Sequence, residues 1–249
     1  MKGLIVGIAN ENSLAWGCAK VLRAQGAELA LTYQSDKARP FVEPLATEAG
    51  CEIFLPLDVT RSEQMAALFD AIRAQWGRLD FVLHSIAFAP KADLQGRFVD
   101  STGMGFAQAM DVSCHSLVRL AHGAEPLMPD GGSILTMSYY GAEKVVPNYG
   151  LMGPVKAALE ASVRYLAADL GPGRIRVNAL SPGPVPTRAA SGLQHFDDLM
   201  ARAAANAPAH QLVTLDQVGE AAAFLLSERS RFITGQVIHV DGGFNITGG

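Results

Sequence analysis

Residues 3–17 read GLIVGIANENSLAWG: an apolar run, a glycine, a short polar loop, and a serine that precedes a second apolar stretch. The run 3–8 predicts a buried strand, and Ser13 predicts the start of a helix because serine is a preferred N-cap residue. Gly7 permits a sharp turn after the strand, and Gly17 permits close packing of the helix on the sheet. A phosphate binds readily at such a helix N-terminus. This unit therefore predicts a nucleotide site.

The same alternation of strand and helix continues along the whole chain, which predicts a parallel sheet with helices on both faces. Near-continuous apolar runs such as LIV, LAL and FVL agree with strands covered on both sides. We expect one α/β domain over 1–249, of the doubly wound Rossmann type with about seven parallel strands, and a substrate-binding loop and helix at 181–206. Strands are expected at 3–8, 28–33, 52–57, 79–85, 132–137, 174–180 and 236–240, and helices at 13–25, 40–49, 62–76, 103–122, 151–170, 195–206 and 215–227.

Composition and charge exclude several classes of protein. The chain has 249 residues, 49% of them hydrophobic, and a formal net charge of −4, which argues against a broad nucleic-acid-binding face. Its 3 cysteines form no CxxC pair, so free thiols are favoured over disulfides or zinc. The histidines show no ligand spacing, and we expect no metal site. No apolar stretch is long enough to span a membrane. A soluble cytoplasmic protein is expected.

Tyrosine and lysine side chains are concentrated in SYYGAEKVVPNYGLMGPVK (138–156). Tyr149 and Lys156 are seven positions apart, so on an ideal helix they lie within about 20° of one face and roughly 10 Å apart. A phenol and an ammonium so placed can converge on one bound molecule, and the cation favours phenolate character. Pro154 is tolerated only in a first helical turn, so we place the helix start near Leu151, with Tyr149 just ahead of it.

The ends of the second and third strands bear on the choice of cofactor. Gln34 stands where enzymes that prefer NAD usually carry a carboxylate, and its amide can still bond a ribose hydroxyl. Lys37 and Arg39 are the cations that would accept a 2′-phosphate. NADH is favoured, with NADPH as the alternative. Asp58 at the third strand end fits either an adenine contact or N-capping, a role that Thr60 could also fill.

Taken together, an ordered series of motifs resembles the NAD(P)H-dependent enoyl-acyl-carrier-protein reductases of bacterial type II fatty-acid synthesis. These enzymes are divergent members of the short-chain dehydrogenase/reductase family, and the resemblance covers nearly the full length. The motifs are GIANENSLAWG (7–17), LTYQSD (31–36), LDV (57–59), HSIAFAP (84–90), SYYGAEKVVPNYGLMG (138–153), SPGPVPTRAASG (181–192) and TGQVIHVDGG (234–243).

The resemblance implies hydride transfer from NADH to the β-carbon of a trans-2-enoyl thioester of acyl-carrier protein or coenzyme A. It implies that Tyr149 stabilises the resulting oxyanion, that Lys156 holds the nicotinamide ribose, that Tyr139 lines the acyl pocket, and that the enzyme is a homotetramer. The implied cofactor-binding residues are Gly7, Ser13, Leu14, Gln34, Asp58, Val59, Ser85, Ile86, Lys156 and Thr187. The implied substrate-binding residues are Ala87, Tyr139, Met152, Leu193 and Phe196.

Two other readings stay open. An ordinary short-chain dehydrogenase, such as a 3-ketoacyl reductase, reads TGxxxGxG, NNAG and YxxxK, of which the first two are absent here. A literal YxxxK exists at 140–144, but Tyr140 directly follows the fifth strand instead of entering the next helix. The other alternative is a catalytically silent NAD(H)-binding relative, and the presence of Tyr139, Tyr149 and Lys156 argues against it.

The chain departs from the family pattern at two places. Asp197 and Asp198 stand where relatives that dock the acidic carrier protein often carry cations, so we expect little discrimination between carrier-protein and coenzyme A thioesters. Ala87 stands where many relatives have glycine. Its methyl group is expected to narrow the nicotinamide pocket and to weaken flat aromatic inhibitors such as triclosan.

Overall fold

The computed structural model describes residues 1–187 and 196–247, and its strands form one parallel sheet in the order β3-β2-β1-β4-β5-β6-β7. The order changes direction between β1 and β4, which is where ligands bind in doubly wound sheets. The predicted Rossmann-type α/β fold is confirmed. The strands are β1 (Lys2–Val6), β2 (Glu28–Tyr33), β3 (Ile53–Pro56), β4 (Phe81–His84), β5 (Gly132–Met137), β6 (Ile175–Pro182) and β7 (Val237–Val240).

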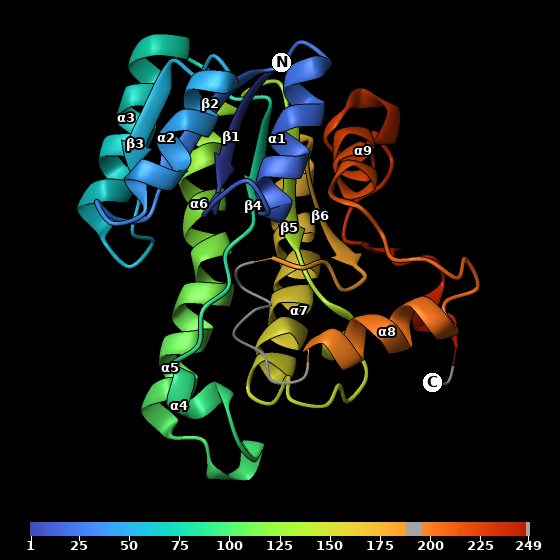
Figure 1. The fold of residues 1–249 in the computed structure, drawn as a ribbon. Coiled ribbons are helices and arrows are strands. Elements are labelled where there is room, and N and C mark those ends of the chain that lie inside the picture. Colours follow the sequence, from blue (N-terminus) through green and yellow to red (C-terminus); the bar gives the residue numbers. More distant parts are fainter. Residues whose placement is uncertain (188–195, 248–249) are drawn as a thin grey trace.

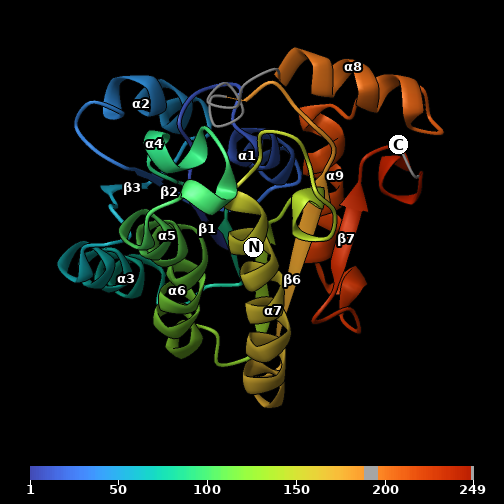
Figure 2. The same ribbon diagram turned by 90° about the horizontal axis from the view of Figure 1, so that it is seen from below.

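Helices cover both faces of the sheet, with α1, α2 and α9 on one side and α3, α6 and α7 on the other (Figures 1 and 2). Neighbouring strand residues point to opposite faces, so Leu4 joins one core and Ile5 the other. The helices are α1 (Leu14–Ala24), α2 (Arg39–Glu48), α3 (Ser62–Trp76), α4 (Lys91–Leu94), α5 (Gly103–Met110), α6 (Ser116–Ala124), α7 (Met152–Leu170), α8 (Phe196–Asn206) and α9 (Leu215–Leu226).

Most predicted elements agree with the structure to within a few residues. Helix α7 begins at Met152, with Leu151 preceding it and Pro154 in its first turn, as expected. The short helix α4 was not predicted. Gly17 was expected to let the first helix pack closely on the sheet, and this prediction is wrong, because Gly17 packs against α9 instead. A Cβ atom there would lie 2.8 Å from the Leu215 carbonyl oxygen.

The helix expected at 103–122 is interrupted by a turn of π-helix, η2 (Asp111–His115), between α5 and α6. The backbone N–H group of Ser116 closes the turn on the Asp111 carbonyl oxygen, and two side chains also donate to carbonyl groups of the turn. Arg119 donates to the Asp111 carbonyl oxygen, and the Ser116 hydroxyl donates to that of Val112. A π turn inserts one extra residue and has no strong sequence signature, which is why periodicity alone missed it.

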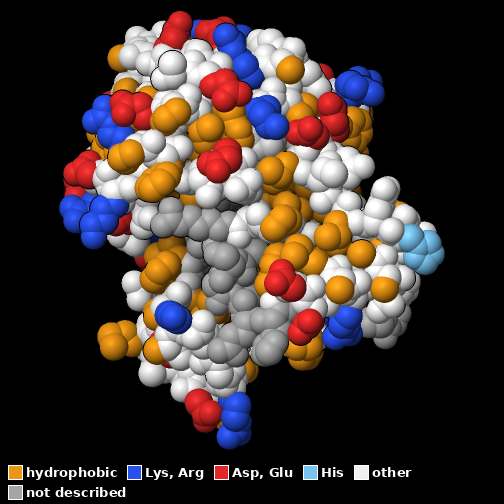
Figure 3. All heavy atoms as spheres, viewed as in Figure 1, with side chains coloured by type: hydrophobic (Ala, Val, Ile, Leu, Met, Phe, Trp, Pro, Cys, Tyr) orange, Lys and Arg blue, Asp and Glu red, His pale blue; other side chains and the backbone are white. Residues whose placement is uncertain are grey.

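The carboxyl ends of the strands point toward the part of the molecule that carries α4, α5 and α8 (Figure 1). In the space-filling view, apolar side chains gather over this part of the molecule, and acidic side chains lie over the beginning of α8 (Figure 3). None of the helices in residues 1–187 and 196–247 combines the length and apolar character that a membrane crossing requires.

Candidate active site

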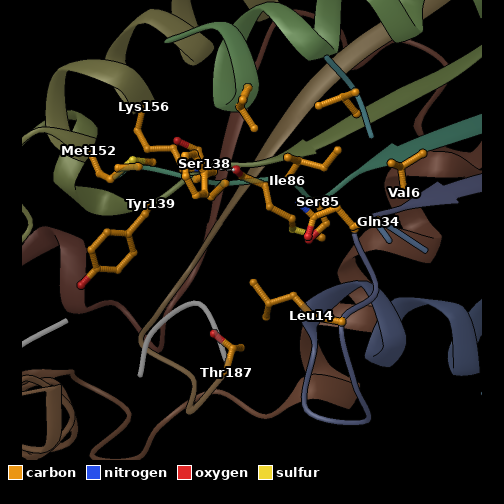
Figure 4. Close-up of a pocket in the computed structure, with 18 of the residues that line it drawn as sticks. Val6, Leu14, Gln34, Ser85, Ile86, Ser138, Tyr139, Met152, Lys156 and Thr187 are labelled. Carbon is orange, nitrogen blue, oxygen red and sulfur yellow. Dashed lines mark hydrogen bonds between the residues drawn. The ribbon is translucent and has the colours of Figure 1, made fainter. Parts of the chain in front are cut away.

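A cavity of about 800 Å³ lies at the carboxyl ends of the strands, within the usual size range of ligand pockets. It extends from Gln34 at one end to Tyr139 at the other, with Leu14 and Thr187 on the wall between them (Figure 4). Of the sequence-predicted site residues, the cavity is lined by Gly7, Leu14, Gln34, Asp58, Val59, Ser85, Ile86, Ala87, Tyr139, Tyr149, Met152, Lys156, Thr187 and Phe196. Leu193 lies outside the described residues.

Gly7 forms the floor of the cavity where β1 approaches β4. Its φ is +107°, in the region that favours glycine, and a Cβ atom there would lie 2.0 Å from the Ser85 carbonyl oxygen. The sharp turn expected after the first strand is therefore present. Only a residue without a side chain leaves room for the two strand ends and for a ligand against them.

Ser13 has a different role from the one expected. It precedes α1, but its hydroxyl caps no helical N–H group. Instead the hydroxyl accepts hydrogen bonds from the backbone N–H groups of Ala9 (2.9 Å) and Asn10 (3.0 Å). Ser13 is buried and does not line the cavity. The capping prediction is wrong, and Ser13 holds the loop that leads into α1.

Asp58 and Gln34 mark the end of the cavity farthest from the tyrosines. Asp58 accepts from the backbone N–H (3.0 Å) and the hydroxyl (2.7 Å) of Thr60. Arg61 occupies the N-cap position of α3, so neither Asp58 nor Thr60 caps that helix. Arg39 is paired with Glu43 at 2.8 Å, and this carboxylate disfavours a phosphate group beside it. These features favour a cofactor with a free ribose hydroxyl.

Lys156 is 5% exposed and points into the other half of the cavity (Figure 4). Its Nζ donates to the Met137 carbonyl oxygen at 2.6 Å. An ammonium group has three donors, so further N–H groups are left for a ligand. Burial lowers the pKa of Lys156 to about 8, and the carboxyl group of Glu160 opposes that shift.

Tyr149 is presented by a tight turn ahead of α7. Asn148 and Gly150 on either side have φ values of +63° and +41°, and Gly141 packs on the phenol ring so closely that a Cβ atom there would lie 2.4 Å from it. Burial raises the pKa of Tyr149 above its ordinary value, and Tyr139 and Glu160 raise it further. The expected phenolate character is therefore wrong, because burial and the two neighbouring acidic groups all favour the protonated phenol. Tyr149 is a neutral hydrogen-bond donor.

Tyr139 lies edge-on to Tyr149, with 4.8 Å between ring centroids. Burial raises the pKa of Tyr139 to about 12. Its hydroxyl is buried and has no hydrogen-bond partner, which is costly unless a bound molecule supplies one. Tyr140 and Lys144, the literal YxxxK pair, do not line the cavity. Tyr140 packs against Phe244 instead.

Comparison with known proteins agrees with this geometry. A family model described as Enoyl-(Acyl carrier protein) reductase matches residues 7–245. The chain belongs to this family. It is 50% identical to enoyl-[acyl-carrier-protein] reductase [NADH] FabI of Rickettsia felis over 99% of this chain and 95% of that protein. It is 49% identical to enoyl-[acyl-carrier-protein] reductase [NADH] 1 of Rhizobium meliloti over 99% and 91%.

Solved structures of enoyl-acyl-carrier-protein reductases have the same fold. The enzyme from Anaplasma phagocytophilum, solved in complex with NAD, is 51% identical and superimposes with a TM-score of 0.96 over 100% of this chain and 95% of that one. The enzyme from Aquifex aeolicus is 44% identical with a TM-score of 0.96, over 100% and 97%.

Several residues that line the cavity of this enoyl reductase were not singled out by the motifs. Ser138 directly follows β5, and the rule that ligands meet the carboxyl ends of strands could have identified it. Gln108 and Val112 lie on either side of the start of the π turn, which was itself not predicted. Lys91 comes from the unpredicted helix α4.

The buried His84, which directly precedes the cavity residue Ser85, has a structural role. His84 is bonded to Thr136 through Nδ1 (2.7 Å) and to Ser116 through Nε2 (2.8 Å). Burial and, to a lesser extent, the Lys156 ammonium group lower the pKa of His84 to about 3, so the ring is neutral. In the part of the chain that the structure describes, no three His, Cys, Asp or Glu side chains are grouped closely enough to hold a metal ion.

Replacing Ala87 by glycine is expected to strengthen inhibition by triclosan. Ala87 lines the cavity after β4, and removing its methyl group widens the space available to a flat aromatic ring. We expect an inhibition constant lower by about threefold to tenfold, the value of one methyl-sized contact. Inhibition constants of the two proteins, measured at one NADH concentration, check this. Equal constants would contradict it.

Proposed function

We propose that the chain reduces the 2,3 double bond of trans-2-enoyl thioesters in fatty-acid elongation. The observation that carries the proposal is the convergence of Tyr149, Lys156 and Tyr139 at one end of a cavity whose other end carries Gln34. NADH, when bound, supplies the hydride that adds to the β-carbon of the thioester. The residues of the chain bind and orient both molecules and stabilise the charge that develops on the substrate.

Tyr149 acts on the thioester carbonyl group. Hydride addition at the β-carbon moves negative charge onto the carbonyl oxygen and produces an enolate. A neutral phenol donates a hydrogen bond to that oxygen, and the interaction strengthens as charge develops. The raised pKa of Tyr149 supports this assignment, because the phenol keeps its proton. The unpartnered hydroxyl of Tyr139 is available to the same end of the substrate.

Lys156 binds the nicotinamide ribose of the cofactor. Its bond to the Met137 carbonyl oxygen directs the ammonium group, and its free N–H groups suit the hydroxyls of the nicotinamide ribose. At neutral pH most of this group is charged, given a pKa of about 8. The buried cation also makes the cavity electropositive, which favours an enolate.

Oxidation of NADH in the presence of 2-enoyl thioesters tests the proposal. Crotonyl and longer 2-enoyl thioesters are compared with 3-ketoacyl thioesters, each with NADH and NADPH. We expect rapid NADH oxidation with the enoyl substrates alone, lost in Lys156→Ala. Turnover of 3-ketoacyl substrates instead would identify an ordinary short-chain dehydrogenase. Cofactor binding without any turnover would identify a silent relative.

Activity is expected to fall as pH rises through about 8. The lowered pKa of Lys156 means that the ammonium group loses its proton in this window, and its attraction for the cofactor and the enolate goes with it. Below about pH 7 the lysine is almost fully charged, so its contribution is constant. The pH profile of kcat/KM for NADH checks this, and a profile that is flat from pH 7 to 9.5 would contradict it.

We expect carrier-protein and coenzyme A thioesters of the same acyl chain to give kcat/KM values within about tenfold of each other. Asp197 and Asp198 are exposed in the first turn of α8, near the Phe196 edge of the cavity. Their charge repels an acidic carrier protein, and rim charges act mainly on association rates. Asp197→Lys is expected to raise kcat/KM for the carrier-protein substrate alone. A carrier-protein preference far above tenfold in the wild type would refute this.

The chain also forms a cytoplasmic homotetramer in this proposal. Exposed aromatic side chains support association, since Tyr165 of α7 is 76% exposed and Phe232 is 93% exposed. Light scattering would then report four times the 26.3 kDa chain mass. A mass equal to one or two chains would overturn the assignment.

A further inference from the structure

A buried carboxyl group lies directly behind the cavity wall. Glu160 stands one helical turn beyond Lys156 in α7 and is 7% exposed. It shares a short hydrogen bond with the hydroxyl of Ser138. Ser138 in turn lines the cavity beside Lys156 (Figure 4). Stabilisation of the oxyanion by Tyr149 makes no use of this pair.

The bond between Ser138 and Glu160 has two possible directions. When Glu160 is ionised, the serine hydroxyl donates to the carboxylate. When Glu160 carries a proton, its O–H donates to Ser138 Oγ, and the serine hydrogen becomes free for an acceptor in the cavity. Proton transfer along the pair is therefore a concerted exchange that leaves both residues hydrogen-bonded.

Charged groups around Glu160 extend toward the surface. Glu143 follows the 3-10 turn η4 (Tyr140–Ala142), and its carboxylate contacts His239 Nε2 of β7 at 3.0 Å. The Glu143 side chain is 44% exposed, and the Nδ1 atom of His239 is buried without a hydrogen-bond partner. Asp241 lies 4.0 Å from that Nδ1 atom. Glu143 and His239 are thus partly exposed charged groups whose electrostatic field reaches Glu160.

These groups also act on the protonation of Glu160. Burial raises its pKa above the ordinary value, against the effect of the Ser138 hydrogen bond. Glu143 raises it further, while His239 and Arg164 lower it. The carboxyl group can consequently take up a proton closer to neutral pH than an exposed glutamate does.

We propose that Ser138 and Glu160, which share a hydrogen bond at the cavity wall, deliver the proton that completes the reduction. This rests on the proposed reductase function, in which hydride addition leaves an enolate. The Ser138 O–H bond breaks as a C–H bond forms at the enolate α-carbon, and Ser138 takes a replacement proton from Glu160. Solvent then reprotonates Glu160, so each turnover consumes one proton. Ser138 is the residue that touches substrate, and Glu160 acts through it.

The pH dependence of kcat, with saturating NADH and crotonyl coenzyme A, tests the relay. Wild type is compared with Glu160→Gln, which keeps the shape but cannot titrate, and with Ser138→Ala. Ser162→Ala is the matched control, because Ser162 is a hydroxyl on the same helix that bonds the Ala158 carbonyl oxygen away from the cavity.

We expect Glu160→Gln and Ser138→Ala each to lower kcat at pH 6.5 by about tenfold or more, at the low end of what general acid–base groups contribute. In the wild type, kcat should begin to fall at a pH below the range near pH 8 in which Lys156 loses its proton, because Glu160 loses its proton first. This early fall in kcat should be absent in Glu160→Gln. Both variants should show a larger solvent deuterium effect on kcat, because proton delivery becomes limiting. Ser162→Ala should match the wild type.

Several outcomes would overturn the relay. One is a wild-type pH profile in Glu160→Gln. A second is a higher KM for NADH with an unchanged profile, which would mean that Glu160 only positions Lys156. If Glu160→Gln does not fold, a wild-type kcat and solvent effect in Ser138→Ala would overturn it equally. A wild type that leaves enoyl thioesters unreduced would instead refute the reductase function itself.

Discussion

Replacing Tyr149 by phenylalanine is expected to lower kcat on 2-enoyl thioesters by about 100-fold to 1,000-fold, the usual cost of removing one oxyanion-stabilising donor. The ring remains, so its packing against Tyr139 and Gly141 should persist. KM for NADH should change little, because the cofactor contacts assigned to Lys156 and Gln34 are intact. Steady-state kinetics with crotonyl coenzyme A measure both quantities.

Tyr140→Phe is the matched control for that experiment. It removes the same hydroxyl from the neighbouring literal YxxxK motif, but Tyr140 does not line the cavity, and its ring contact with Phe244 is kept. We expect kcat within about twofold of the wild type. The assignment of the phenol would be wrong if Tyr140→Phe lost activity while Tyr149→Phe retained it.

Gly7→Ala is expected to have the second largest effect, on stability and cofactor binding together. The added methyl group would lie 2.0 Å from the Ser85 carbonyl oxygen, and a φ of +107° is unfavourable for alanine. Relieving the overlap requires the ends of β1 and β4 to move apart. Backbone strain and overpacking together should reduce the free energy of unfolding by about 2–5 kcal/mol. The Kd for NADH should rise by about tenfold or more.

Gly26→Ala separates strain from overlap. Gly26 has a φ of +86°, so alanine meets a similar backbone penalty, but a Cβ atom there would have nothing within 4 Å. We expect a loss of about 1–2 kcal/mol in the free energy of unfolding and an unchanged Kd for NADH. Urea denaturation and a fluorescence titration with NADH measure these values. Equal losses in the two variants would exclude a specific role for the contact between Gly7 and Ser85.

The fold could be predicted because its signal is repeated along the whole chain. Alternating apolar strands and amphipathic helices leave few architectures open, and short errors at element ends do not change the topology. The helix start at Met152 was also predictable, since Pro154 can occupy only a first turn. Tyr149 could then be placed just ahead of the helix, where the structure has it.

The errors arose where a side chain had more than one local partner. Ser13 was expected to cap α1, but the loop amides of Ala9 and Asn10 compete for the same hydroxyl. Tyr149 was expected to carry phenolate character, but burial, Tyr139 and Glu160 all raise its pKa. Gly17 was assigned to the sheet, although α9 lies closer. Each outcome depends on distances between segments remote in sequence, which local patterns do not contain.

The π turn between α5 and α6 determines which direction the side chains of α6 face relative to those of α5. The two helices and the turn form one continuous helical segment. One extra residue rotates everything after it by about 100° relative to a regular helix. Gln108 and Val112 thereby face the cavity, while Leu117 and Leu120 face the sheet. The number of residues in this helical segment is consequently as important to the structure as the types of residue it contains. Deleting a single residue there would turn one of the two surfaces away from its partner, even if every remaining side chain were kept.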